Sequence, residues 1–537
     1  MEPAELVGAL AVLDPRWVWW SARETAAPLV RVGVRPRTCW DLGAVSRLTY
    51  GSRREDPAAV WAAAAGLDAP RRLSAELSLL DLAGDSSEAV RDDGQLSRQW
   101  AAGVWANDAE TARQWAALAL TVQARQLAVL GELPDPRGAP GPPGLPVLTA
   151  WAESAAALLA VELEHDGMPV DRAVAADLLT HAAGPRPATP ADEHRLRRER
   201  DAAVLRHFPG EPVDLRNPMQ VRDLLARIGL DVPDTRSWRL EPHASTLPAV
   251  AALLHWRKAE RLLSTYGWQW LDTHVGADGR LRGAWGAADA AAGRMTAQAG
   301  LHNLPSELRP AVRAEQGWLF VRADLGQIEP RVLAVVSGDE RLAAAARERD
   351  MYAPVAAQLR CDRPTAKVAV LAAMYGQTSG TAGAALKDMD RAYPQAMAYL
   401  RAAEQAGQRR TDLRTYGGRL LRVSQAGPAL GEPVGEHVSV STGVGRFARN
   451  AVVQGAAAEL FKAWAATVRD GLSSLGGLIV LCLHDELLLH VPNKAATEAS
   501  TLLESALEST ASWWAAGSNV RFVADVGVGP SWPEAHP

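Results

Sequence analysis

The chain has 537 residues, 48% of them hydrophobic and 22% charged, which predicts several folded domains and excludes a largely disordered protein. The formal net charge of −5 excludes a uniformly basic nucleic-acid binder, so any contact with nucleic acid must come from a local cationic groove. Three cysteines, Cys39, Cys361 and Cys482, lie far apart in no metal-type spacing and fit reduced thiols of a cytosolic protein.

The N-terminal stretch MEPAELVGALAVLDP has no basic segment ahead of an apolar one, so no signal peptide is expected. No apolar run approaches the roughly 20 residues that a membrane-spanning helix needs. We therefore expect a protein that does not enter a membrane.

Residues 1–132 are predicted to form a small α/β domain. Strand-like runs at Trp17–Trp20 and Leu29–Val34 precede a helical pattern at Ala109–Leu130. The next segment, LPDPRGAPGPPGLPVL at 133–148, is so rich in proline and glycine that it predicts an interdomain linker.

An arm of helices is predicted after this linker, up to about residue 285. Asn217 followed by Pro218 is a typical helix start. The predicted helices cover Ala150–His165, Ala173–Ala182, Arg195–Arg206, Pro218–Ile228 and the long stretch 248–275.

Two later segments place carboxylates at the ends of apolar strands. The first strand, Leu319–Ala323, ends at Asp324; a helix follows from about Gln327 to Val336, and Glu340–Gln405 is mostly helical. The second is a hairpin in which an acidic turn separates two strands. Its strands are Leu478–Leu483 and Leu487–Val491, and its turn is His484, Asp485 and Glu486.

Taken alone, each carboxylate has an ordinary interpretation. Asp324 fits a helix N-cap, and the turn containing Asp485 fits a solvated loop that keeps charge out of the core. Taken together, two carboxylates on rigid strands can also hold a pair of divalent ions, because hard cations prefer oxygen ligands on fixed supports.

A third segment, DRPTAKVAVLAAMYG, predicts a helix that Asp362 caps. Arg363, Lys367, Leu371 and Tyr375 follow one another at intervals of four residues, so they form a slowly drifting stripe. One interpretation is a solvated cationic turn above a core stripe. The other is a pair of cations that grip a triphosphate beside apolar and aromatic side chains that stack on the nucleotide.

In order and spacing these segments resemble DNA polymerases of family A, the group of bacterial DNA polymerase I. The family's first catalytic motif is matched by FVRADLGQIEPRVLAVVSGD, its fingers-helix motif by RPTAKVAVLAAMYG, and its final catalytic motif by LHDELLLHVP. The resemblance runs from about residue 150 to the end of the chain. Four further stretches agree with it: LLSTYG (262–267), GRMTAQAGLHNLP (293–305), RFARNAVVQGAAAELFKAW (446–464) and WPEAH (532–536).

The resemblance implies a multidomain α/β (α+β) fold, a right-hand polymerase with palm, thumb and fingers, preceded by a truncated RNase H-like domain of the 3′-5′ exonuclease type. This is a Klenow-type arrangement. The expected divisions are 1–132 for the degenerate exonuclease-like domain, 133–148 for the linker, 149–290 for the thumb and the approach to the palm, 291–338 for the palm with the first catalytic motif, 339–430 for the fingers, and 431–537 for the palm with the final catalytic motif.

The same resemblance implies the residues of the reaction centre. Asp324, the Leu325 carbonyl and Asp485 would hold two divalent ions, expected to be Mg²⁺, and Glu486 would be an auxiliary acid near the primer end. Lys367 would also protonate the departing pyrophosphate. The implied nucleotide-binding residues are Gln327, Glu329 (a steric gate against the ribose 2′-hydroxyl), Arg363, Lys367, Leu371 and Tyr375.

The DNA-binding residues implied by the resemblance are Arg294, Arg446, Asn450, Gln454 and His484. The expected activity is template-dependent addition of deoxynucleotides to a primer 3′-hydroxyl, with release of pyrophosphate. The expected partners are primer-template DNA and deoxynucleoside triphosphates. We also expect a monomer in the bacterial cytoplasm, associated with the nucleoid, that serves DNA replication or repair.

Some positions depart from the family pattern. Leu371 stands where an aromatic side chain is usual, so we expect altered sugar discrimination rather than inactivity. Near the triphosphate, Tyr352 stands where a histidine is usual. Two alternatives stay open. One is a non-catalytic DNA-binding protein that has kept the polymerase fold, and the other is a nucleotidyltransferase that uses ribonucleotides or an RNA template.

The N-terminal region departs further. No Asp-x-Glu motif lies on an early strand, and Ser21 and Thr25 occupy the positions expected to be Asn and a catalytic Asp. Asp108 matches an acid of the last exonuclease motif, but Val104 replaces its tyrosine. Because uncharged hydroxyls cannot replace carboxylates around two divalent ions, we expect no proofreading exonuclease activity.

Overall fold

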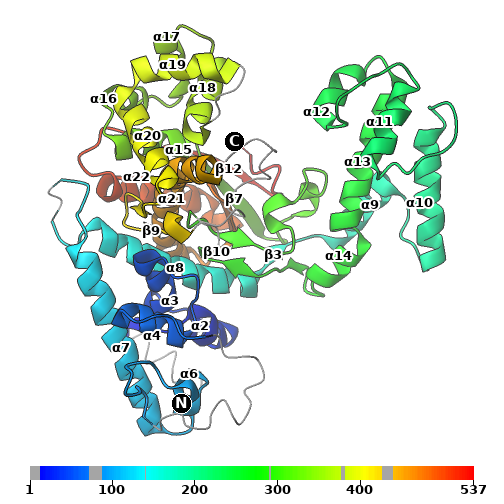
Figure 1. Ribbon diagram of the computed structural model, residues 1–537. Helices are drawn as coiled ribbons and strands as arrows, with labels where there is room; N and C mark the ends of the chain where they lie inside the picture. The colour runs from blue at the N-terminus through cyan, green and yellow to red at the C-terminus, as the bar shows by residue number, and fades with distance from the viewer. Residues whose placement is uncertain are drawn as a thin grey trace.

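The computed structural model describes residues 13–71, 88–138, 141–288, 292–376, 381–425 and 440–536. Figure 1 shows a central sheet flanked by two helical projections, one containing α16–α20 and the other α10–α13, with the N-terminal helices α2–α7 below. The described part of the chain therefore has the predicted palm, fingers and thumb, preceded by a further N-terminal unit.

The palm is built on an antiparallel four-stranded sheet with the strand order β10-β11-β7-β12. Six of the seven residues of β11 are buried, as the apolar sequence predicts for a strand covered on both faces. The helices α8, α21 and α22 pack against these strands. The bounds are β7 Trp318–Leu325, β10 Leu478–Cys482, β11 Glu486–Pro492, β12 Ala524–Gly529, α8 Leu145–Asp166, α15 Ile328–Ser337, α21 Val440–Leu472 and α22 Ala496–Trp514.

Helix α8 corrects two sequence predictions. It begins at Leu145, so the last residues of the predicted 133–148 linker are helical. It is also long and apolar enough to cross a membrane, although no apolar run of that kind was expected. Since 72% of its most apolar window is buried inside the protein, this apolarity is that of a core helix.

The fingers are helical, as predicted for Glu340–Gln405. Asp362 accepts a hydrogen bond from the Thr365 backbone N–H at 2.8 Å, which confirms the predicted cap of the cationic helix. The helices are α16 Glu340–Ala345, α17 Tyr352–Leu359, α18 Arg363–Tyr375, α19 Thr381–Ala392 and α20 Pro394–Gln408.

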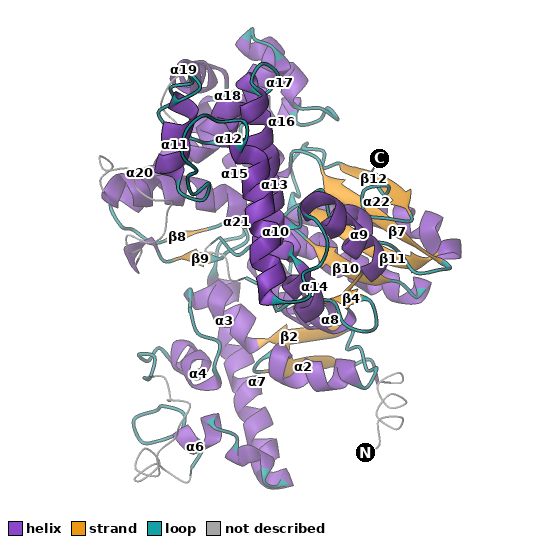
Figure 2. Cartoon of the chain, turned by 90° about the vertical axis from the view of Figure 1, so that its right-hand side faces the viewer, coloured by secondary structure: helices purple, strands orange, loops and turns teal. Residues whose placement is uncertain are grey.

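The thumb is an arm in which α10 and α13 run side by side (Figure 1), so that they overlap in the view of Figure 2. The predicted 248–275 helix is interrupted at Gly267, where a Cβ atom would lie 2.3 Å from the Leu263 carbonyl oxygen. Only glycine fits this close approach, so the chain restarts as a second helix. The bounds are α9 Arg172–Ala183, α10 Pro190–Leu205, α11 Pro218–Ala226, α13 Pro248–Tyr266 and α14 Trp268–His274.

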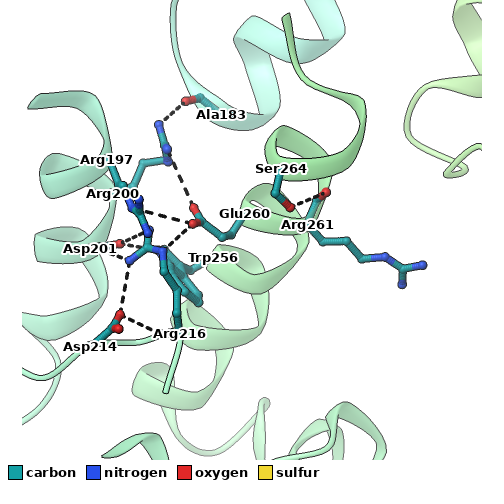
Figure 3. A network of polar contacts seen from close by, with 10 residues as sticks. All are labelled: Ala183, Arg197, Arg200, Asp201, Asp214, Arg216, Trp256, Glu260, Arg261 and Ser264. Atoms are coloured by element: carbon teal, nitrogen blue, oxygen red, sulfur yellow. Dashed lines mark hydrogen bonds and ion pairs between the residues drawn. The ribbon is translucent and has the colours of Figure 1, made fainter. Parts of the chain in front are cut away.

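Arg216, in the loop before α11, ties the two long thumb helices together (Figure 3). Its Nε donates to Glu260 of α13 at 2.6 Å, and its Nη1 donates to Asp201 of α10 at 2.8 Å. Asp201 also accepts from the Trp256 indole N–H at 2.8 Å. Because the guanidinium is planar, one arginine can hold carboxylates from both helices at once.

The N-terminal unit contains a two-stranded parallel sheet and several helices. The strand predicted at Leu29–Val34 is wrong: Ala22, Ala26 and Val30 are spaced by four and bury one face of a helix that includes Leu29. The elements are β1 Arg16–Trp19, α2 Ala22–Arg31, β2 Thr38–Asp41, α3 Leu42–Tyr50, α4 Pro57–Ala65, α6 Arg98–Ala101 and α7 Ala109–Glu132.

Arginines of the N-terminal unit hold it on the palm. Arg23 donates to Glu164 of α8 at 3.0 and 2.8 Å, and Arg37 donates to Asp470 of α21 at 2.6 Å. Short remaining elements connect these parts: β3 Met168–Pro169, α12 Ser237–Leu240, β4 Arg280–Leu281, β5 Trp285–Gly286, β6 Thr296–Ala297, β8 Leu413–Arg414 and β9 Leu420–Leu421.

Candidate active site

The palm sheet brings the two predicted carboxylates to the same end. Glu486 of β11 pairs with Asp324 of β7, so Asp485 comes level with Leu325. The Leu325 backbone N–H donates to the Asp485 carbonyl oxygen at 2.7 Å. The register of the antiparallel strands β7 and β11 therefore fixes Asp324 and Asp485 side by side, although they lie 161 positions apart in the chain.

Burial and mutual repulsion dominate the electrostatics of this acid pair. Burial raises the pKa of Asp324 to about 6, helped by the charge of Asp485 and opposed by Arg322. Burial also raises the pKa of Asp485, with the charge of Glu486 as the next cause. Both shifts show that negative charge is poorly compensated here by the protein itself.

The donor set of this site suits a divalent cation. Within the described ranges, no group of three or more His, Cys, Asp or Glu side chains is arranged to hold a metal. Two close carboxylates that repel one another nevertheless offer the hard oxygen ligands that Mg²⁺ prefers, and Mg²⁺ commonly completes its shell with substrate phosphates and water. Asp324 and Asp485 therefore fit the predicted metal ions.

Glu486 lies in β11 rather than in the turn where it was predicted. Its carboxylate is 8% exposed and accepts from Arg322 Nε at 2.7 Å, from Arg322 Nη2 at 3.0 Å and from the Trp532 indole N–H at 2.7 Å. The turn thus consists of His484 and Asp485, and Glu486 belongs to β11, where its carboxylate contacts Arg322 and Trp532.

The first cation of α18 lies against an acid at the start of α17. Arg363 Nε donates to Asp350 at 2.6 Å, and Gln327 Nε2 donates to the same carboxylate at 3.0 Å. Gln327 adopts the left-handed conformation, with φ of 59°, which turns its side chain toward this cluster. Arg363 is exposed, so a stronger anion such as a phosphate can compete with Asp350 for its guanidinium.

Glu329, the predicted steric gate, is held between the palm and the fingers. It forms an ion pair with Arg294, and the Tyr375 hydroxyl donates to its other oxygen at 3.3 Å. Burial raises the pKa of Tyr375, so the phenol stays a hydrogen-bond donor, and Gln454 of α21 bonds to the same side chain. Four predicted site residues from separate segments therefore meet here.

The remaining predicted residues lie on two surfaces near this cluster. Lys367 is exposed on α18, and Leu371 is half-buried between Lys367 and Tyr375. His484 stacks edge-on against His302, with ring centroids 5.3 Å apart. Arg446, Asn450 and Gln454 share one face of α21 by their spacing of four, and the Asn450 side-chain oxygen is buried without a hydrogen-bond partner among the described residues.

The N-terminal positions weighed for nuclease chemistry are not gathered into a site. Asp108 caps α7, accepting from the backbone N–H groups of Glu110 and Thr111 at 2.8 and 2.9 Å. Ser21 precedes α2 and Thr25 lies within it, whereas Val104 begins a separate short turn. The one carboxylate among them therefore has a structural function.

Sequence reasoning missed two charged residues of the site. Asp350 has no distinguishing signal in the sequence, because its importance depends on the folding of α17 against Gln327 and α18. Arg322 did have one: it is a charge inside an apolar strand, two residues before Asp324 and hence on the same face.

Comparisons with known proteins agree with the fold. The sequence model of DNA polymerase family A matches residues 197–534. Curated DNA polymerase I sequences from Thermus filiformis and Chloroflexus aurantiacus are 31% identical over 56% and 29% identical over 61% of this chain. The chain spans 38% of the length of each. The polymerase domain of Pol1 from M. smegmatis, solved in complex with DNA primer-template and dNTP, has a similar fold, with a TM-score of 0.63 and 21% identity over 94% of this chain and 82% of that one.

Proposed function

Because the chain belongs to DNA polymerase family A, we propose that it is a DNA-directed DNA polymerase. One observation carries the proposal: Asp324 and Asp485 lie side by side at the end of the palm sheet, and Tyr375 of the cationic helix α18 donates to Glu329, whose charge acts on Asp485. Nucleotidyl transfer needs these two features together, since acids hold the metal ions and cations hold the triphosphate.

In the proposed reaction the primer 3′-hydroxyl oxygen forms a bond to the α-phosphorus of a deoxynucleoside triphosphate. The bond between the α-phosphorus and the bridging oxygen breaks, and pyrophosphate leaves with that electron pair. The hydroxyl proton passes to solvent, and Lys367 can give a proton to the pyrophosphate.

Asp324, Asp485 and the Leu325 carbonyl are the proposed ligands of two divalent ions, expected to be Mg²⁺. When bound, such ions supply acidity to the attacking hydroxyl and neutralise charge on the leaving phosphate. Arg363 would exchange its contact with Asp350 for the incoming phosphates. The chain itself would therefore contribute orientation of the reacting groups and the positive charge of Arg363 and Lys367 near the phosphates.

Selection of deoxynucleotides is proposed for Glu329 and its neighbours. Glu329 is fixed by Arg294 and Tyr375, and a fixed carboxylate excludes a ribose 2′-hydroxyl by contact and by lack of space. Gln327 lies on the adjacent turn, and Leu371 offers an apolar surface for the sugar. Tyr375 is proposed to stack with the templating base.

Primer-template DNA is the proposed partner of Arg294, Arg446, Asn450, Gln454 and His484. Hydrogen-bond acceptors in the minor groove are nearly independent of sequence, which suits an enzyme that accepts every correct base pair. We further propose a monomer that works in the bacterial cytoplasm, in replication or repair. The intact acid pair and cationic helix weigh against a non-catalytic DNA-binding protein.

The N-terminal unit is proposed to be a degenerate exonuclease-type domain without activity. Asp108 is occupied as a helix cap, and the positions of Ser21 and Thr25 carry no carboxylate. Purified protein should therefore not shorten a primer when nucleotides are left out. Metal-dependent shortening that Asp108→Ala abolishes would contradict this.

The test of the polymerase proposal is primer extension on a defined template with each deoxynucleotide and ribonucleotide in turn. Asp485→Asn should abolish extension, whereas Asp388→Asn, which removes an acid paired with Arg391 on the fingers, should not. Extension by Asp485→Asn at the wild-type rate would overturn the proposal. A preference for ribonucleotides would overturn the assignment of Glu329.

A further inference from the structure

Arg322 is a charged side chain inside the apolar strand β7. Its side chain is 7% exposed, and it lies on the same face of the strand as Asp324 because strand side chains alternate. Two of its nitrogens contact Glu486, and its Nη2 also lies 3.4 Å from Asp324 Oδ2. One guanidinium thus bridges a proposed metal ligand and a neighbouring acid.

The contacts of Glu486 leave its carboxylate fully engaged. Arg322 binds both of its oxygens, and the Trp532 indole N–H donates to Oε1 at 2.7 Å. A carboxylate held in this way has its oxygens directed at Arg322 and Trp532, although its charge still raises the pKa of Asp485. Four acids lie at this end of the sheet, because Asp525 of β12 pairs with Asp324. Glu486 is engaged by Arg322 and Trp532, and Asp525 forms an ion pair with Arg349, whereas Asp324 and Asp485 are the proposed metal ligands.

Arg322 is more than a hydrogen-bond partner of the sheet. Its Nη1 is buried and has no hydrogen-bond partner in the part of the chain that the structure describes. A buried charge with an unmatched donor adds little stability compared with an apolar side chain of similar size. Its position next to Asp324 suggests instead that its charge acts on the acid pair.

We propose that Arg322 is a positioning residue that withdraws Glu486 from the metal site and sets the net charge that a divalent ion meets there. The inference rests on the proposed metal site at Asp324 and Asp485. It predicts that the free enzyme binds divalent ions weakly and that the triphosphate brings much of the charge needed to retain them.

The test is titration of the full chain with Mn²⁺ alone, without DNA or nucleotide, followed by electron paramagnetic resonance. Arg322→Gln removes the positive charge and releases Glu486, so Mn²⁺ should bind at least about tenfold more tightly. Glu486→Gln leaves the arginine charge uncompensated beside Asp324, so binding should weaken by about as much. Arg322→Lys keeps the charge and should stay within about threefold of wild type.

The double variant Arg322→Gln, Glu486→Gln removes both charges, so its Mn²⁺ affinity should return to near the wild-type value. It also leaves no buried charge without a partner, so it is the variant expected to fold if Arg322→Gln does not. Arg349→Gln is the matched control. Arg349 pairs with Asp525 on the same sheet but is 76% exposed, so its loss should have little effect.

Two failures are distinguishable. If Asp324→Asn leaves Mn²⁺ binding unchanged, the proposed metal site itself is wrong. If Asp324→Asn weakens binding but Arg322→Gln does not tighten it, or if the double variant is as tight as Arg322→Gln alone, the inference about Arg322 is overturned and the metal site stands. Melting temperatures separate a change in charge from a loss of folding.

Discussion

Asp41 and Asp324 occupy the same local pattern, a strand followed by an aspartate and then a helix, yet the fold uses them differently. Asp41 at the end of β2 is 4% exposed and accepts from the backbone N–H groups of Ala22 and Ala44 and from the Trp19 indole N–H. The Asp324 side chain is 37% exposed and is contacted by Arg322 at 3.4 Å. Burial raises the pKa of both, to about 7 and about 6.

The two aspartates differ in whether their carboxylate oxygens accept hydrogen bonds from the backbone of the following helix. Asp41 caps α3, so its carboxylate completes the end of a helix. At the second site Gln327 takes the N-cap position of α15 and makes no capping hydrogen bond with its side chain, and Asp324 does not cap the helix either. An aspartate with a raised pKa is structural when its oxygens accept hydrogen bonds from the protein. It is a candidate for catalysis when its oxygens are free to bind a ligand.

The largest effect should come from Asp324→Asn. The neutral amide cannot support a divalent ion as a carboxylate does, so we expect primer extension to fall by on the order of 10³-fold or more. The melting temperature should not fall, because the substitution relieves repulsion with Asp485. Single-turnover extension and thermal unfolding of the same preparation measure both quantities. A large loss of stability would show that Asp324, like Asp41, is a structural acid.

Asp41→Asn should give the opposite result. Its amide N–H₂ would face backbone or indole donors, so local opening of α2 and α3 should become easier by about 1–3 kcal/mol, with primer extension retained. Native-state hydrogen exchange on the full chain detects such local opening without assuming two-state unfolding. If Asp41→Asn leaves hydrogen exchange unchanged but abolishes primer extension, Asp41 is not a structural acid and the contrast with Asp324 is wrong.

The pH dependence of that local stability provides a separate prediction. Burial raises the pKa of folded Asp41 to about 7 from the ordinary aspartate value of 3.8, with the charge of Glu55 adding to the shift. Between these values the folded state holds a proton that the unfolded state has released, so the Asp41 contribution to stability falls as pH rises from about 4 to about 7. Above and below this window it is constant.

This sign can be measured as a difference between two proteins. The opening free energy of wild type minus that of Asp41→Asn should be smaller at pH 8 than at pH 5, because only wild type titrates at this position. Subtraction removes the contributions of other groups. An unchanged difference would mean that the three hydrogen bonds keep Asp41 ionised throughout.

The sequence predicted elements where local signals agree with the final packing. Asp362 and Asn217 cap helices as expected, and the strand before Asp324 was found, although it extends to Leu325. The Leu29–Val34 run has the composition of a strand, but the spacing of Ala22, Ala26 and Val30 prevails because their face is buried. Composition alone cannot tell which period the tertiary contacts will select.

The candidate site shows the same limit. The motifs predicted that Asp324 and Asp485 come together, because their order along the chain is that of a known family. They did not predict that Glu486 would turn toward Arg322, since that depends on the register of β11 against β7. Partners of a strand residue are decided across the sheet, and a shift of one residue would place Glu486 on the other face.

A smaller effect is expected at Leu371, which lies half-buried between two site residues of α18. Leu371→Phe adds a π-face without a charge, so the ratio of dideoxynucleotide to deoxynucleotide use should change by about fivefold to tenfold. Competition between the two nucleotides in one extension reaction measures this ratio. An unchanged ratio would mean that Leu371 does not contact the sugar and belongs with the structural side chains.

The smallest effect should come from Asp525→Asn, which tests whether position alone makes an acid functional. Asp525 of β12 pairs with Asp324 across the sheet, but its carboxylate accepts from Arg349 at 2.6 Å. An exposed ion pair of this kind contributes little, so extension should change by less than about threefold and stability by less than about 1 kcal/mol. A loss as large as that of Asp324→Asn would place Asp525 among the metal ligands. In that case, the number of hydrogen bonds that the protein makes to an aspartate would not predict whether that aspartate is structural or catalytic.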